Sequence, residues 1–292
     1  MTFQQLTGLV LQASIVMTVF GFGLQATVAD ILYLLRRPAL LVRSIGAMYL
    51  VMPLVAIALA TTFNLLPSVR IAMIALALSP MPPLLPGKQG KAGGHTPYAL
   101  GLMAVVGLLA IAVVPIEVQL VGRYSGQRFQ MDPVVIARVV LVTTLLPLSI
   151  GMAIAALLPA VAARVASPVA SAAKVLLTLG MLALLATALP AVLPLVGNGT
   201  LLAIAVFVAA GLAVGHLAGG SRRDEQIVLA LSTASRHPAI ALAVARANVP
   251  DEAHLGGTVL LFLLVGGLVG APYLAWQRRR AQETPPLEVS VQ

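Results

Sequence analysis

The feature that most constrains this chain is an apolar stretch with a polar centre, Gln226–Val249. It exceeds the roughly 20 residues that a helix needs to cross a bilayer. Its centre holds Ser232, Thr233, Ser235, Arg236, His237 and Pro238. Proline has no amide hydrogen and clashes with the preceding turn, so we predict a helix break at Pro238. A charge at membrane depth is costly and usually functional. We therefore interpret this stretch as a broken helix that lines a solute site.

The composition places the whole chain in a membrane. Hydrophobic residues make up 60% of it, charged residues only 9%, and the mean hydropathy is +1.01. Long apolar runs without strand-like alternation predict helices rather than a barrel. The net charge of +9 lies mostly in short loops, where it sets topology, so no nucleic-acid partner is expected. With no cysteine and no nucleotide-loop or metalloprotease motif, we predict no enzyme activity, no cofactor and no metal site.

Nine apolar segments of near-membrane length are expected. They are residues 5–26, 39–61, 69–87, 97–121, 133–158, 170–194, 199–219, 226–248 and 256–276. The connections are short, so residues 1–280 are predicted to form one transmembrane domain with repeats of about 1–125 and 130–280. The polar tail 281–292 is predicted to be a disordered cytoplasmic segment.

Basic residues predict the orientation of the chain. With the N-terminus outside, the inner loops carry ten Lys and Arg residues and the outer side carries five. Because positively charged loops favour the cytoplasmic side, we predict an inner-membrane protein with the N-terminus outside and the C-terminus in the cytoplasm.

The third segment is the second irregular one. Its prolines are Pro80, Pro82, Pro83 and Pro86, which cannot continue a regular helix. One interpretation is a broken helix inside the protein, because lipid does not tolerate exposed broken backbone. The alternative is that the span simply ends near Pro80 and the prolines form an inner loop. The irregular third and eighth spans occupy matching places and run in opposite directions, which is typical of inverted-repeat secondary transporters.

The stretch Phe20–Leu59 resembles the bile acid:sodium symporter family. The matching elements are Phe20-Gly21-Phe22-Gly23-Leu24, Asp30, Arg37-Pro38 and Met52-Pro53, in the family's order and spacing. The resemblance implies a panel domain plus a core domain, with spans 3 and 8 as two broken helices that cross at mid-membrane. It also implies sodium-driven transport of organic anions. Family members have ten or nine spans, and this chain resembles the nine-span form.

This chain departs from the family at the sodium sites. The family's Pro-Gly-Gly-Thr-Ala-Ser-Asn run is replaced by Pro80–Pro86, and the acid of the second crossing helix is replaced by Ser232. Lys88 and Lys91 stand in what is expected to be an enlarged loop. The fold and the transporter class carry over from the resemblance, and the sodium ligands do not.

Arg236 is the strongest candidate for substrate binding. Its guanidinium could replace sodium as a fixed cation or bind an anion, and the alternative is that carbonyl groups freed at the breaks cap it. Ser232, Thr233 and Ser235 could line the site or serve as ordinary helix packing. His237 could carry a proton, or be a neutral core residue. No acid is expected at mid-span to neutralise Arg236, because Asp30 and Glu117 lie near opposite ends of their helices. Two alternatives stay open for Glu117, an ion pair with Arg123 and solvation.

Three functions remain open at this point. The first is a secondary transporter or facilitator of small organic anions that is not coupled to sodium in the family's manner, with protons as a candidate coupling ion. The second is a sodium-coupled symporter of bile-acid type. The third is a non-transporting membrane protein that keeps the fold for binding or sensing.

Overall fold

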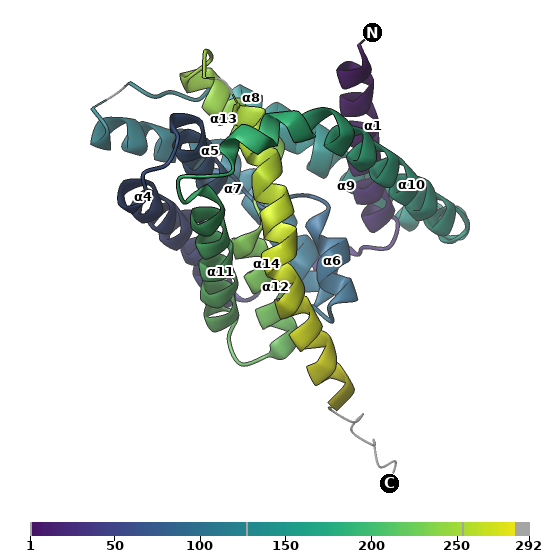
Figure 1. The fold of residues 1–292 in the computed structure, drawn as a ribbon. Helices are drawn as coiled ribbons and strands as arrows, with labels where there is room; N and C mark the ends of the chain where they lie inside the picture. Colours follow the sequence, from purple (N-terminus) through teal and green to yellow (C-terminus); the bar gives the residue numbers. More distant parts are fainter. Residues whose placement is uncertain (1, 127, 253, 284–292) are drawn as a thin grey trace.

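The computed structural model describes residues 2–126, 128–252 and 254–283, and every regular element within them is helical (Figure 1). The α-helices are α1 (Phe3–Gly23), α2 (Val28–Ile31), α3 (Pro38–Gly46), α4 (Met52–Thr62), α5 (Pro67–Leu78), α6 (Leu85–Lys91), α7 (Thr96–Tyr124), α8 (Pro133–Val140), α9 (Leu146–Leu157), α10 (Pro159–Val192), α11 (Thr200–Ala218), α12 (Arg223–Ala234), α13 (Pro238–Asn248) and α14 (Leu255–Glu283). Two π-helical turns, η1 (Ala47–Val51) and η2 (Leu141–Leu145), and the 3-10 turn η3 (Leu193–Leu195) complete the elements. The prediction of an all-helical membrane protein is confirmed.

Eight helical segments are long and apolar enough to cross a membrane. The predicted third span is not one of them, because α5 has 12 residues, α6 has 7, and non-helical chain separates the two. The loop predicted between 158 and 170 is helical instead, since α10 begins at Pro159 and runs for 34 residues. Pro159 stands in the first turn, where a missing amide hydrogen costs little, and the alanine-rich sequence continues the helix through Pro168.

The helices form two groups. α1 packs along α9 and α10, and the three lie together on one side of Figure 1. Glycine allows the α1–α9 contact, since a Cβ atom at Gly23 would lie 3.0 Å from the Cα atom of Gly151. In the other group, α5 packs against α4, α13 and α14, and α11 packs against α12 and α14.

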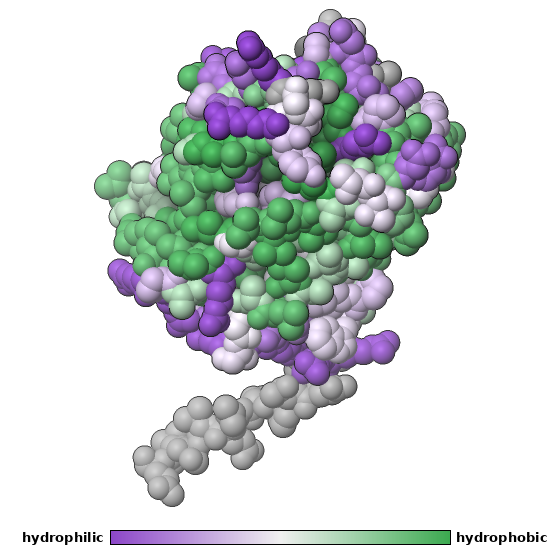
Figure 2. Space-filling model, turned by 90° about the vertical axis from the view of Figure 1, so that its left-hand side faces the viewer, coloured by the Kyte–Doolittle hydropathy of each residue, from purple (hydrophilic) through white to green (hydrophobic). Residues whose placement is uncertain are grey.

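The surface and the ends of the chain fit a membrane layer. Figure 2 shows hydrophobic side chains across the middle of one face, with hydrophilic side chains gathered above and below them. The N-terminus and the C-terminal end of α14 lie at opposite ends of the molecule in Figure 1. The predicted tail begins inside α14, which ends at Glu283, and residues 284–292 lie outside the described part of the chain.

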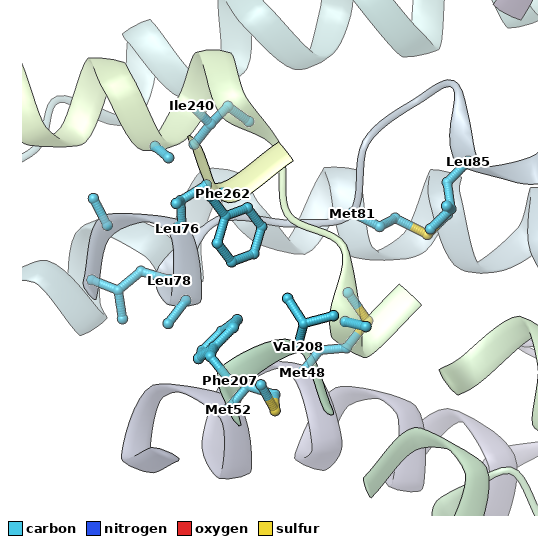
Figure 3. Packing of buried hydrophobic residues seen from close by; sticks show 14 of the residues in the cluster. Met48, Met52, Leu76, Leu78, Met81, Leu85, Phe207, Val208, Ile240 and Phe262 are labelled. Carbon is cyan, nitrogen blue, oxygen red and sulfur yellow. The ribbon is translucent and has the colours of Figure 1, made fainter. Parts of the chain in front are cut away.

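The buried core surrounds the places where α5 and α12 end. Phe207 of α11 and Phe262 of α14 meet edge to face with their ring centroids 5.7 Å apart. Met48, Met52 and Leu76 are fully buried beside them. Figure 3 shows these side chains around the two connecting segments that leave the helix ends. The irregular backbone is therefore enclosed by protein, as lipid requires.

Candidate functional site

The first break lies between α5 and α6. α5 ends at Leu78, and the chain from Ser79 to Pro82 has no helical structure. Pro86 stands in the first turn of α6, where its missing amide hydrogen leaves no helical bond unmade. The enlarged loop expected around Lys88 and Lys91 is wrong, because both residues belong to α6.

The second break lies between α12 and α13. α12 ends at Ala234, and Ser235 to His237 connect it to α13, which begins at Pro238. His237 is the N-cap residue of α13, and its Nδ1 accepts from the amide of Ile240 at 3.5 Å. Its Nε2 atom is buried without a hydrogen-bond partner. The ring nitrogen Nδ1 of His237 therefore caps α13, and Nε2 makes no hydrogen bond within the described residues.

The two breaks cross and are joined by hydrogen bonds. The amide of His237 donates to the carbonyl oxygen of Pro80 at 2.8 Å and also approaches the Ser79 hydroxyl at 3.1 Å. In Figure 3 the segment that carries Met81 passes the one that leads to the helix of Ile240. α5 packs beside α13, and α6 beside α12. Each unwound segment therefore supplies partners for the other's free backbone groups.

Arg236 occupies this crossing and is 0% exposed. Its Nη1 donates to the carbonyl oxygen of Ser79 at 3.1 Å, and its Nη2 donates to that of Met48 at 3.2 Å. Its Nε has no hydrogen-bond partner. The Ser79 carbonyl is free because Ser79 has extended backbone after the end of α5, so no helical amide follows to donate to it.

The Met48 carbonyl is free for a related reason. In η1 the amide of Met52 bonds to the carbonyl of Ala47, five residues back. The same register would pair the Met48 carbonyl with residue 53, which is Pro53 and has no amide hydrogen. π-helical turns of this kind often occur at functional sites. A helix defect and a helix break thus provide the two acceptors that hold Arg236.

The other predicted residues divide between the crossing and the helix contacts. Ser232 is fully buried, and its hydroxyl accepts from Gln89 Nε2 at 2.7 Å. Thr233 instead donates to the Gly211 carbonyl of α11, away from Arg236. Ser235 is half-buried, and its hydroxyl makes no hydrogen bond within the described residues. The structure therefore groups Arg236 and His237 with the crossing and gives Thr233 a packing role.

Glu117 lies near the end of α7 and, among the described residues, lacks the ion pair to Arg123 that was one of its two expected alternatives. Its charge and that of Arg236 act on each other, and Tyr49 lies within the same electrostatic range. Oε2 of Glu117 is buried without a hydrogen bond, and no ion pair with Arg123 exists in the described part of the chain. No ion pair or hydrogen bond joins Glu117 to Arg236 in the described part of the chain, so their interaction is electrostatic only. The expectation that no acid neutralises Arg236 therefore stays a prediction.

A second polar cluster, formed by Tyr33, Arg37, His95 and Glu225, lies where α12 begins. Glu225 is only 6% exposed, although it stands beside charged residues at the start of a helix. It accepts from Tyr33 at 2.6 Å and from Arg37 at 2.5 Å. Burial, followed by the bond to Glu225, raises the pKa of Tyr33 to about 12. Burial also lowers the pKa of His95, whose ring lies 4.5 Å from that of Tyr33.

Two discontinuous helices that cross inside an all-helical membrane bundle define a class of protein, since transporters form their binding sites from such helices. The comparison with known families agrees with this class. Residues 13–217 match the profile of the sodium bile acid symporter family, and the chain belongs to that family. Its members are transporters, so the chain is a multi-pass membrane protein of a transporter family with a small-molecule substrate. A search of curated proteins found no match. The family match ends before α12, so Arg236 lies beyond it.

Proposed function

We propose that the protein is a secondary transporter of small organic anions, and that it works by alternating access without the family's usual sodium coupling. The observation that carries this proposal is the buried guanidinium of Arg236 between the two helix breaks. A permanent cation stands where the family resemblance places sodium. The guanidinium gives the crossing a positive charge without a bound sodium ion.

The substrate class follows from the charge at the crossing. Guanidinium groups bind carboxylates and sulfonates through charge-assisted hydrogen bonds, and Nε of Arg236 is a donor without a protein partner. The N-terminus of α13, which begins at Pro238, adds a partial positive charge. Ser235 is half-buried beside the arginine and adds a hydroxyl. These groups favour an anion over a cation or a neutral solute.

The same contacts disfavour sodium at the crossing. Sodium would need oxygen ligands, and the carbonyls of Ser79 and Met48 already accept from Arg236. Ser232 stands where the family has an acid, and its hydroxyl is engaged by Gln89. Sodium coupling through other oxygens is the competing function, and it predicts a sodium-dependent rise in thermal stability.

The two helix groups suggest the moving parts. α1, α9 and α10 correspond to the panel expected from the family, and the remaining helices correspond to the core. Counting α5 and α6 as one interrupted span adds a ninth to the eight apolar helical segments of the described chain. The proposed topology has these nine spans and an external N-terminus. Movement of the core against the panel would then expose the crossing to each side of the inner membrane in turn.

Uptake by proteoliposomes tests the proposal. Labelled taurocholate and a panel of small carboxylates are supplied with and without a sodium gradient. We expect uptake of at least one anion that is insensitive to sodium, a large loss in Arg236→Ala, and a smaller loss in Arg236→Lys, which keeps the charge but not the planar fork. Steep stimulation by sodium would establish the competing function. No anion flux in any variant, with the fold intact, would leave a binding or sensory protein as the answer.

A further inference from the structure

Glu117 has the features of a working group without an assigned role. It lies on α7, and one of its carboxylate oxygens is buried without a hydrogen bond. The side chain as a whole is half-buried, and a buried carboxylate oxygen without a hydrogen bond or an ion pair is costly, so it is retained for a reason. The positive charge that acts on it is Arg236, at the crossing of the broken helices.

Few other titratable groups face Glu117. Tyr49, whose hydroxyl donates to the Val106 carbonyl at 2.8 Å, is within electrostatic range of Glu117 and Arg236. The other charged residues on α7 and on the elements packed against it are Arg123 on α7, Asp30 on α2, Arg70 on α5, Lys88 and Lys91 on α6, Arg138 on α8, and Arg223, Asp224 and Glu225 on α12. None of them makes a hydrogen bond or an ion pair with Glu117 within the described residues. Arg236 is the cation whose charge acts on Glu117.

A cavity of about 440 Å³ opens one helical turn from Glu117. Val121, Tyr124 and Ser125 line it, and they lie four, seven and eight residues beyond Glu117 on the same face of α7. Ile57 of α4 and Ile74 of α5 close the other walls. Water in this cavity would stand one turn from the carboxylate, which gives a proton a short route to it.

We propose that Glu117 is the proton-binding residue that couples anion transport to the proton gradient. This inference rests on the proposed function. With the site empty and Glu117 ionised, the charges of Glu117 and Arg236 sum to zero. A monovalent anion bound at Arg236 would leave one uncompensated negative charge in a low-dielectric interior. A proton on Glu117 restores neutrality, so one proton accompanies each anion across the membrane.

Proton binding is tested first, because it needs no substrate. Dicyclohexylcarbodiimide reacts with protonated carboxyl groups in apolar surroundings, and peptide mass spectrometry locates the adduct. Labelling at Glu117 should fall about tenfold per pH unit once the pH exceeds its pKa. Glu117→Gln should also remove a pH-dependent carboxylic-acid band from the infrared difference spectrum. Asp251→Asn, at an exposed carboxylate, is the matched control and should change neither signal. Labelling that is absent or independent of pH, with no band lost, would overturn the proposal.

Transport supplies the second measurement. An inward proton gradient should raise taurocholate uptake severalfold in the wild type and in Asp251→Asn, and the stimulation should vanish in Glu117→Gln. Wild-type uptake that does not change with the proton gradient would overturn proton coupling through Glu117. It would not contradict the proposal that the protein transports anions. If the wild type moves no anion, the proposed function fails, and the labelling experiment still decides whether Glu117 binds a proton.

Discussion

Replacing Pro53 with alanine tests whether a missing amide hydrogen is what holds Arg236 in place. The substituted alanine would bring an N–H group to the position from which the Met48 carbonyl can accept. Arg236 Nη2 would then lose exclusive use of an acceptor that it now reaches at 3.2 Å. A hydrogen bond to a charged group contributes about 1.5–3 kcal/mol, and a neutral backbone bond about 0.5–1.5 kcal/mol.

The chain contains a matched control for this change. In η2 the amide of Leu146 bonds to the carbonyl of Leu141, and Pro147 follows. This repeats the arrangement of η1, Met52 and Pro53, and Pro147 is also buried. No side-chain donor among the described residues bonds to the Val142 carbonyl, which corresponds to that of Met48. Pro147→Ala therefore gives the same gain in helix propensity as Pro53→Ala, but it does not compete with a hydrogen bond from an arginine.

The informative quantity is the difference between the two variants. Pro53→Ala should be less stable than Pro147→Ala by about 1.5–3 kcal/mol, the value of the charged bond. At about 2 °C per kcal/mol, its melting temperature in detergent should be lower by ~3–6 °C. Pro53→Ala alone should also lower anion uptake. Equal melting temperatures and equal uptake would refute the account of why Arg236 stays at the crossing.

Three further predictions concern packing and pH. Ser232→Ala should lower the free energy of unfolding by about 1 kcal/mol, because Gln89 loses a hydrogen-bond acceptor. Ser235→Ala is the control and should change this free energy by less than about 0.5 kcal/mol. Thermal unfolding of the two variants measures the difference. Gly215→Ala should cost about 1–3 kcal/mol, because a Cβ atom there would meet Ala230 Cα at 2.5 Å, whereas Gly256→Ala meets open space and should be neutral or stabilising. Folding raises the pKa of Tyr33 from 10.0 to about 12, so the stability that this phenol contributes is complete below pH 10 and is lost as the pH rises to 12. Tyr33→Phe should flatten that alkaline loss, and equal losses in both proteins would contradict the role of Tyr33.

Local chemistry explains which parts of the fold were predictable. The cluster of Pro80, Pro82 and Pro83 cannot continue a regular helix, and the described chain is non-helical at Pro80 and Pro82. The helix is also broken before Pro238, which begins α13, although single prolines such as Pro115 and Pro168 lie inside helices. The membrane segments were also predictable from local properties, because a helix needs about 20 consecutive apolar residues to cross a bilayer. Lys88 and Lys91 were expected in an enlarged loop after the third span. They belong to α6, whose Gln89 is buried and donates to the Val228 carbonyl of α12 at 2.8 Å, a contact that only the packed structure reveals.

The burial of the charges was not predictable in this way. Glu225 follows Asp224 and two arginines and reads as a solvated helix start. It is buried because Tyr33 and Arg37 reach it from a segment near the beginning of the chain. Glu117 reads as the end of a membrane helix that pairs with a nearby arginine. Its nearness to Arg236 depends on how α7 packs against the crossing, and periodicity contains no information about that packing.

The sequence alone determined that the chain crosses a membrane, where two of its helices are interrupted, and that an arginine stands in one interruption. These properties depend on hydropathy and on the missing amide hydrogen of proline, which belong to single residues and their neighbours. Only the tertiary structure decided which carbonyls accept from Arg236, which acid acts on it electrostatically and which polar residues are buried. Those outcomes depend on contacts between residues far apart in the chain, because electrostatic energy depends on distance in space and not on distance in sequence.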